Sequence, residues 1–306
     1  MATAHTDLSQ TPRLAHLQFL FDQRHRFSRA LASKAIAAFG NEWAVDFEGA
    51  LAVLCPDIEM LGAAAKGYSA FAFDSMRRQK AFEKALEYPH KTYAQAASEV
   101  YFNDKHMTEE YLPGLLLSHY LWPHHYRQLQ FFDTAFIGAM RSNPDCRFAE
   151  VGVGTAVYSR RVLTRLHGSN GAGYDISPSS CRFASGLLRD EITKGRYAMH
   201  QQDIIAQPIT PGVPWLICVE VLEHLEQPVE FLRGLRACLA PGGKAFITAA
   251  LNAAHSDHIY LYRTGEEVWD HLRAAGFSLE QSMLATAYEP PGDGVPVPMA
   301  AAFVVY

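Results

Sequence analysis

The chain of 306 residues has few cysteines, and none of them belongs to a CxxC pair. Zinc ribbons and redox-active dithiols need closely spaced thiols, so the sequence indicates neither. Widely separated thiols fit a reducing intracellular compartment. The cysteines are Cys55, Cys146, Cys181, Cys218 and Cys238.

Positive charge is also sparse and scattered. Lysine and arginine total 27 against 32 acidic residues, and the formal net charge is -5. Phosphate contacts dominate the binding of nucleic acids. The absence of a basic stripe therefore argues against a nucleic-acid partner.

Long apolar runs are missing as well. No stretch approaches the ~18 apolar residues that a membrane span needs. Residues 1–7 lack the charged and apolar regions of a secretory signal. We therefore expect a cytoplasmic protein with no membrane partner.

The composition is that of a globular protein, with 49% hydrophobic and 19% charged residues. Residues 1–142 show apolar positions at helical spacing and form a predicted all-helical domain. Its predicted helices cover residues 14–39, 42–54, 59–86, 92–101, 112–122 and 123–140. Gly40 follows the first of them and is expected to end it.

The pattern changes at residue 143, where short apolar runs begin to alternate with helical segments. Such alternation is typical of a parallel sheet wrapped by helices. The predicted strands cover residues 147–151, 171–175, 197–201, 215–219 and 244–249. The predicted helices cover residues 158–166, 178–191, 229–239 and 266–275. Two more strands, 278–287 and 299–305, follow without a helix between them, which predicts an antiparallel hairpin at one edge of the sheet.

Glycines and acidic residues stand where the predicted strands end. Gly152 and Gly154 follow the first strand and permit a tight turn close to a ligand, at the start of a helix. A carboxylate at the tip of the second strand, Asp175, is placed to accept the hydroxyls of a ribose. The third strand leads to Asp203 and the apolar Ile204, which could receive an adenine.

The segments EVGVGT, GYDIS, QQDI, VEVLEHLEQP and LAPGGKAFIT, in this order, resemble class I S-adenosylmethionine-dependent methyltransferases. The resemblance covers roughly residues 145–306, about half of the chain, and implies a cofactor-binding methyltransferase domain over residues 143–306. It implies an α/β fold with a Rossmann-like seven-stranded sheet, in which six parallel-type strands are joined by an antiparallel C-terminal hairpin strand. The same resemblance implies S-adenosylmethionine as the cofactor.

The family pattern assigns a cofactor role to particular residues of this chain. The first acid and the glycines hold the methionine part, the second acid binds ribose, and the third contacts adenine. The resulting cofactor-binding residues are Glu150, Gly152, Gly154, Asp175, Ile176, Asp203, Ile204 and Glu220. Ala156 departs from the pattern, because many members have a third glycine there. Val157 disfavours a nicotinamide-binding alternative, whose fingerprint has glycine at that position.

Two ligand-rich loops follow the fourth and fifth strands and are expected to overhang the transferred methyl group. An acid pair with histidine, facing a second histidine-rich loop, can bind a divalent cation such as Mg, Mn, Fe or Zn. The E-x-x-E-H run also resembles the small-RNA 3′-terminal 2′-O-methyltransferases, where comparable residues hold a metal. The candidate ligands are Glu220, Glu223, His224, His255 and His258.

An interpretation without a metal stays open, in which His224 and His258 are catalytic residues and His258 acts as a general base. Residues His124, His125 and Tyr126 also have two interpretations, as part of a substrate pocket or as an aromatic helix face packed in the core.

We expect methyl transfer to carbon or oxygen of a small-molecule acceptor, such as an α-keto acid or a hydroxylated aromatic of specialised metabolism. The helical domain would act as a lid, set the choice of substrate or form a homodimer. The alternatives are an RNA-terminal methyltransferase and a non-catalytic cofactor-binding scaffold, since the fold does not settle the reaction.

Overall fold

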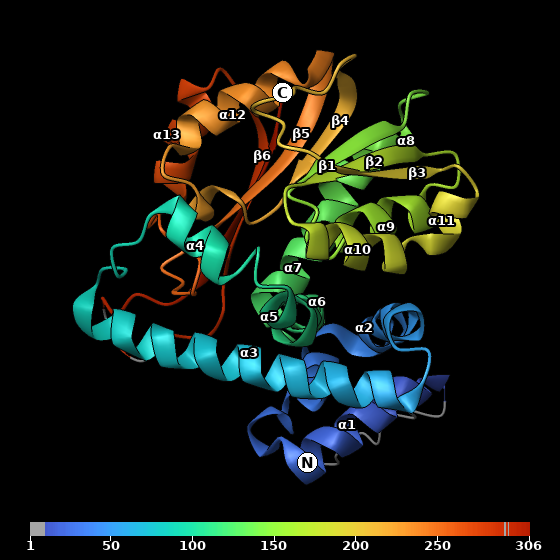
Figure 1. Cartoon of the computed structure of the whole chain (residues 1–306), viewed down its shortest axis with the longest axis vertical. Coiled ribbons are helices and arrows are strands. Elements are labelled where there is room, and N and C mark those ends of the chain that lie inside the picture. The colour runs from blue at the N-terminus through green and yellow to red at the C-terminus, as the bar shows by residue number, and fades with distance from the viewer. Residues whose placement is uncertain (1–9, 291, 293) are drawn as a thin grey trace.

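The computed structural model describes residues 10–290, 292 and 294–306. Within them a helical N-terminal region precedes a helix-covered sheet (Figure 1). The N-terminal helices are α1 (Pro12–Arg24), α2 (Leu31–Leu54), α3 (Ile58–Ala85), α4 (Tyr93–Glu99), α5 (Asp104–His106), α6 (Leu112–Leu121), α7 (Pro123–Phe131) and α8 (Gly138–Arg141). The π-helical turns η3 (Met107–Tyr111) and η4 (Phe132–Ile137) make α5–α6 and α7–α8 continuous.

Among the described residues, seven strands form one sheet in the order β3-β2-β1-β4-β5-β7-β6. They are β1 (Arg147–Val151), β2 (Asn170–Asp175), β3 (Tyr197–Gln201), β4 (Val213–Cys218), β5 (Leu239–Leu251), β6 (Leu279–Thr286) and β7 (Met299–Val305). Neighbours from β3 to β5 pair in parallel, and β7 pairs antiparallel with both β5 and β6. The predicted fold class is confirmed, and the hairpin closes the edge with β6 outermost.

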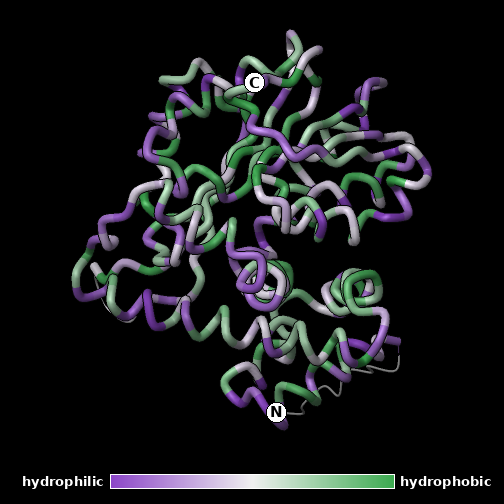
Figure 2. Tube along the Cα trace, in the orientation of Figure 1, coloured by the Kyte–Doolittle hydropathy of each residue, from purple (hydrophilic) through white to green (hydrophobic). Residues whose placement is uncertain are grey.

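Alternation along the strands places the helices on both faces of the sheet. In β5, Phe246 belongs to the core under α7–α9, whereas Ala245 and Ile247 belong to the core under α12 and α13. This is the two-residue period of a strand covered on both sides. The helices that follow β1 are α9 (Val157–Arg165), α10 (Pro178–Leu187), α11 (Arg189–Thr193), α12 (Pro228–Ala237) and α13 (Gly265–Ala274). Figure 2 shows hydrophobic residues along the strands and hydrophilic ones on the outer turns.

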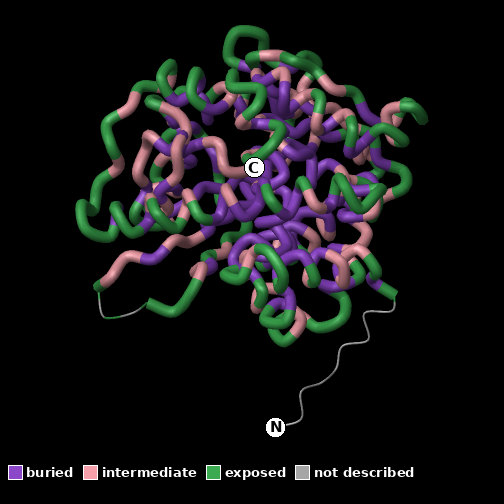
Figure 3. The backbone as a smooth tube through the Cα atoms, turned by 60° about the horizontal axis from the view of Figure 1, so that its bottom comes forward, coloured by how far each residue is buried: buried purple, intermediate pink, exposed green. Residues whose placement is uncertain are grey.

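The helical region and the sheet share one hydrophobic core, which runs from α1 through α9 to β7. Buried residues accordingly gather at the centre of the molecule, where the two regions meet (Figure 3). Arg161 of α9, with 5% of its side chain exposed, pairs with Asp133 of η4 at 2.7 Å and Asp46 of α2 at 2.6 Å. A buried cation is tolerated because both carboxylates compensate it. The boundary predicted at residue 142 stays a prediction, and the core is continuous across it.

The prediction of a single helix over residues 14–39 was wrong. The chain leaves helical geometry at His25, and α2 begins only at Leu31. Gly40, expected to end a helix, kinks α2 instead with φ 75°, and α2 continues to Leu54. None of the described helices combines the length and hydropathy that crossing a membrane requires.

Helix α3 crosses the α5–α6 segment in close backbone contact at Gly67. A Cβ atom there would lie 2.3 Å from the carbonyl oxygen of Glu109. We expect Gly67→Ala to lower the free energy of unfolding by about 1–3 kcal/mol, because neither backbone can yield without separating the helices. Gly62→Ala in the same helix meets no atom within 4 Å and should stabilise by up to about 1 kcal/mol. Urea unfolding of both variants checks this, and equal effects would contradict the close crossing.

Candidate active site

A cavity of about 640 Å³ lies between the helical region and the carboxyl ends of the parallel strands. Its size falls within the range of small-molecule sites. The loops after β1, β2, β4 and β5 form one side, and α3, α6 and α7 form the other. Residues distant in sequence are thereby brought to one place, where ligands bind in open α/β sheets.

The loop after β1 makes the tight turn that the sequence predicted. Gly152 and Gly154 have φ angles of 69° and 47°, and both line the cavity. A Cβ atom on Gly152 would lie 2.5 Å from a methyl of Val221, so that position requires glycine. Ala156 has φ 60°, the left-handed conformation that glycine adopts without strain.

Glu150 lines the cavity from the end of β1 but is also tied to α9. Its carboxylate accepts hydrogen bonds from the backbone amide of Ser159, at 2.9 Å, and from the Ser159 hydroxyl. Burial raises the pKa of Glu150 to about 8, with the Ser159 hydrogen bonds opposing that rise. The acid therefore anchors the start of α9 beside the glycine turn.

Asp175 fastens the tip of β2 to the glycine turn. Its Oδ2 accepts from the Gly154 amide at 2.9 Å, and its Oδ1 accepts from the Ser177 amide at 2.8 Å. Burial raises the pKa of Asp175, although these amides work in the other direction. Asp175 and Ile176 both line the cavity, where the sequence predicted a ribose contact.

Asp203 and Ile204 are not among the residues that line the cavity. Ile204 is buried in the core under α12, and Asp203 accepts from the amide of Ile205 at 2.8 Å. Tyr93 of α4 lines the cavity instead. Burial raises the pKa of its hydroxyl, and the nearby carboxylates of Asp203 and Asp175 add to that rise. The adenine contact of Asp203 thus stays a prediction, and Tyr93 is a candidate that sequence analysis missed.

Two acids of the loop after β4 have different environments. Glu220 lines the cavity, has φ 52° and accepts from the Thr248 hydroxyl at 2.7 Å. Glu223 is fully buried with its carboxylate beside that of Glu220, and neither of its oxygens receives a hydrogen bond of good geometry. Burial raises the pKa of Glu223 well above its usual value, and the charge of Glu220 raises it further.

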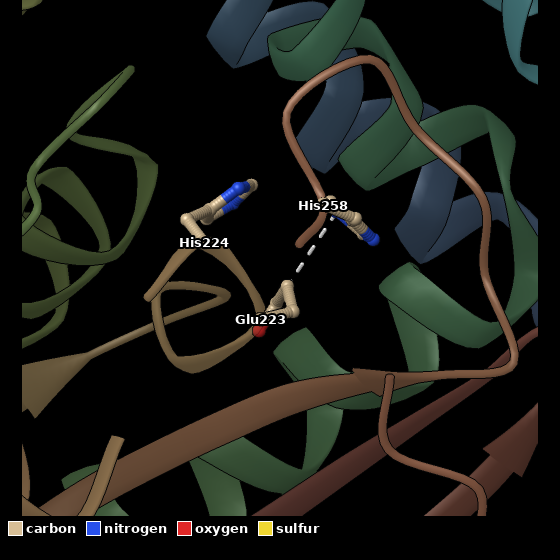
Figure 4. A group of neighbouring side chains, drawn as sticks. All are labelled: Glu223, His224 and His258. Atoms are coloured by element: carbon tan, nitrogen blue, oxygen red, sulfur yellow. Dashed lines mark ion pairs between the residues drawn. The ribbon is translucent and has the colours of Figure 1, made fainter. Parts of the chain in front are cut away.

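Glu223 and His224, from the loop after β4, lie close to His258, from the loop after β5 (Figure 4). One ligand atom from each of the three side chains lies within 4.8 Å of the others, and His258 Nε2 is 4.0 Å from Glu223 Oε1. The Nδ1 of His224 is 3.1 Å from the carbonyl oxygen of Asp257, and the Nδ1 of His258 is 2.7 Å from that of Ala253. Carbonyl oxygens only accept, so we assign the protons to Nδ1. Both Nε2 atoms then carry free lone pairs.

Asp257 is a buried carboxylate behind these rings that sequence analysis gave no role. It accepts hydrogen bonds from the hydroxyls of Tyr111 at 2.7 Å and Tyr101 at 3.1 Å, and its Oδ2 is 3.5 Å from His224 Nδ1. Burial works to raise the pKa of Asp257, but His224 and the other charges around it lower it overall. Its position between His255 and His258 was the one signal in the sequence, and the two tyrosines gave none.

Three of the five predicted metal ligands are gathered and two are not. Glu220 is turned towards Thr248, and His255 places its Nδ1 3.3 Å from the Ser75 hydroxyl of α3. Among the described residues, Glu223, His224 and His258 are the cluster with metal-binding spacing. His124 and His125 line the cavity, as the pocket interpretation predicted, whereas Tyr126 packs in the core.

A known family described as "Methyltransferase domain" matches residues 149–245. No curated protein matches the sequence. Similar solved structures include the mitomycin 7-O-methyltransferase MmcR (15% identity, 82% of this chain and 74% of that one, TM-score 0.51). PigF bound to SAH is also similar (14% identity, 79% of this chain and 73% of that one, TM-score 0.50). So is the [4+2]-cyclase SpnF (16% identity, 72% of this chain and 98% of that one, TM-score 0.50). At such identities the likeness shows the fold.

Proposed function

We propose that this chain, which carries a class I S-adenosylmethionine-dependent methyltransferase domain, transfers the cofactor's methyl group to a small-molecule acceptor held in the same cavity. The observation that carries the proposal is the cluster of Glu223, His224 and His258 beside a cavity that also contains the glycine turn. Methyl transfer is an in-line displacement, so the acceptor atom must lie about 3–3.5 Å from the methyl carbon. A cavity lined by both loops can hold cofactor and acceptor in contact.

The cofactor would lie along the β1 and β2 loops. Gly152 and Gly154 leave room for its methionine part, and Asp175 can accept from its ribose hydroxyls. The start of α9 also lines the cavity, and the N-terminus of a helix favours a carboxylate. Tyr93 offers an aromatic face for the adenine.

A divalent metal fits the Glu223, His224 and His258 cluster. A buried carboxylate without hydrogen bonds is costly unless something pairs with it. The carbonyl oxygens of Asp257 and Ala253 hold the rings of His224 and His258 in place, as hydrogen-bond partners of metal-ligating histidines do. Two imidazoles with one carboxylate suit Zn, Fe or Mn better than Mg. When bound, such an ion would lower the pKa of an acceptor hydroxyl or hold an enolate.

The protein residues would orient the acceptor and exclude water. Asp257, with the hydroxyls of Tyr101 and Tyr111, prevents His224 from turning. Thr248 holds Glu220 at the cavity wall, where a carboxylate can attract the positively charged sulfonium of the cofactor. Among the described residues of the cavity wall, Lys80 is the one cation, so we do not propose an RNA acceptor.

Calorimetric titration of S-adenosylmethionine tests the proposal. We expect Asp175→Asn to weaken binding about 10- to 100-fold, because hydrogen bonds to a charged group contribute about 1.5–3 kcal/mol. Asp190→Asn, on the exposed surface of α11, is the matched control and should leave the affinity unchanged. Absence of cofactor binding in the unaltered protein would refute the proposed function. Binding without methyl transfer to any hydroxylated aromatic or α-keto acid would favour a scaffold role.

A further inference from the structure

The cavity is unusually rich in histidine, with six of the chain's 14 histidines in its wall. His224 and His258 belong to the cluster described above, and four others surround the remaining space. These four, which we call the imidazole wall, are His119, His124, His125 and His255. Their ring nitrogens fix what the wall can bind.

Two members of the imidazole wall present hydrogen-bond donors. The Nδ1 atoms of His119 and His124 are buried and have no partner. A buried N–H without an acceptor costs more than an unused lone pair, so we assign the proton of each ring to Nε2. Both rings line the cavity, and their N–H groups are therefore available to a ligand there.

The other two members present acceptors. The Ser118 hydroxyl donates to the Leu115 carbonyl at 2.8 Å, which uses its only proton. The Nδ1 of His125, 3.2 Å from that hydroxyl, must therefore donate to it. Its Nε2 then carries a lone pair.

The same logic applies on α3. The Ser75 hydroxyl donates to the Phe71 carbonyl at 3.0 Å and receives the Nδ1 proton of His255 at 3.3 Å. His255 Nε2 is thus a second acceptor. The imidazole wall thus presents two hydrogen-bond donors, on His119 and His124, and two acceptors, on His125 and His255.

The imidazole wall is uncharged at neutral pH. Burial lowers the pKa of His119 to about 4 and that of His124 to about 3. Lys80, the one cation among the described residues that line the cavity, is exposed on α3. The charge of a divalent ion would be balanced by Glu223 and Asp257. An anionic ligand would therefore find no uncompensated positive charge inside.

Aromatic rings also line the cavity beside the imidazole wall. Phe71 stacks on Trp122 with ring centroids 5.7 Å apart, and Trp122 stacks on His124 at 5.8 Å. All three line the cavity. Such faces favour a flat ring system that packs against them.

From these observations we infer that the acceptor is an uncharged, flat aromatic molecule that carries both hydroxyl and carbonyl groups, and that the imidazole wall selects it over an α-keto acid. The inference rests on the proposed function and narrows its substrate class. A hydroxyl donates to the lone pairs of His125 and His255, and a carbonyl accepts from His119 and His124. A carboxylate in this place would lose its hydration without a counter-charge.

Three matched probes test the inference by calorimetry in the presence of S-adenosylhomocysteine. They are 6-hydroxy-2-acetonaphthone, 2-acetonaphthone, which lacks the hydroxyl, and 6-hydroxy-2-naphthoate, which carries a carboxylate in place of the ketone. We expect the hydroxyketone to bind about tenfold more tightly than either of the others, because each lost pairing costs about 0.5–1.5 kcal/mol or more. Equal or tighter binding of the naphthoate, or no preference among the three, overturns the inference.

Serine variants test the proton assignment without altering a ring. Ser118→Ala and Ser75→Ala free the Nδ1 atoms of His125 and His255 and should weaken binding of the hydroxyketone about three- to tenfold. Ser69→Ala is the control, because its hydroxyl donates to the Ala65 carbonyl at 2.8 Å in the same manner and has no imidazole partner. Unchanged affinity in both test variants overturns the inference. S-adenosylhomocysteine affinity, measured in parallel, separates this failure from failure of the proposed function.

Discussion

Replacing Glu223 by glutamine should remove a stoichiometric metal ion from the purified protein. The substitution keeps the volume of the side chain and removes the one charged ligand of the cluster. Loss of partners outside the coordination sphere already costs metal affinity about 10- to 100-fold, so loss of a ligand should exceed the upper end of that range. Elemental analysis of untagged protein after reconstitution with Zn, Fe or Mn measures it.

Glu220→Gln is the matched control for this experiment. Glu220 belongs to the same loop, but its carboxylate is held by Thr248 at 2.7 Å, so metal content should be preserved. Equal loss in both variants would place the ion between the two acids rather than with the histidines. If the unaltered protein takes up no ion, the metal is excluded. Activity lost in His258→Ala would then support a general base instead.

Acidification should destabilise the protein steeply between pH 6.5 and about 4, because its buried histidines are neutral when folded. Burial lowers the pKa of His119 from 6.5 to about 4. In that interval His119 binds a proton in the unfolded chain but not in the folded chain, so the free energy of unfolding falls as the pH falls. His119 alone contributes a loss of about 2 kcal/mol between pH 7 and pH 5, and His124 behaves in the same way.

Urea unfolding at pH 7 and pH 5 measures this effect. In His119→Gln the difference in the free energy of unfolding between the two pH values should shrink by about 2 kcal/mol, whatever the stability of the variant at pH 7. The control is His90→Gln, at an exposed position, which should leave the pH difference unchanged. An unaltered difference in His119→Gln would mean that this imidazole is already accessible to protons in the folded state.

Short-range patterns predicted the sheet well. Residues 147–151 and 197–201 are strands within the predicted limits, since apolar runs between turns leave few alternatives. The break at His25 was missed because no glycine or proline marks it. The start at Asp104 was missed as well, although the Asn103 side chain accepts from the His106 amide at 3.2 Å and caps the helix.

The candidate site was predicted in outline but not in its contacts. Motifs identified His224 and His258, whose loops follow neighbouring strands. They could not separate Glu223 from Glu220, because that difference depends on a threonine 28 residues away. The imidazole wall could not be predicted from the sequence for the same reason, because it forms only when α3 and α6 are placed against the loop after β5.

Helix α3 and the segment that follows it form hydrogen bonds with the loop that carries His258. The side-chain amide of Gln79 donates to the Asn252 carbonyl and accepts from the Ala254 amide, both at 3.0 Å, and the Tyr88 hydroxyl donates to the Ala253 carbonyl at 2.5 Å. The helical region therefore shapes the reaction centre as well as covering it. Exchanging the helical region between enzymes to change the acceptor would therefore require exchanging residues 252–258 as well. The helical region and this loop are held together by hydrogen bonds and would have to be transferred as one unit.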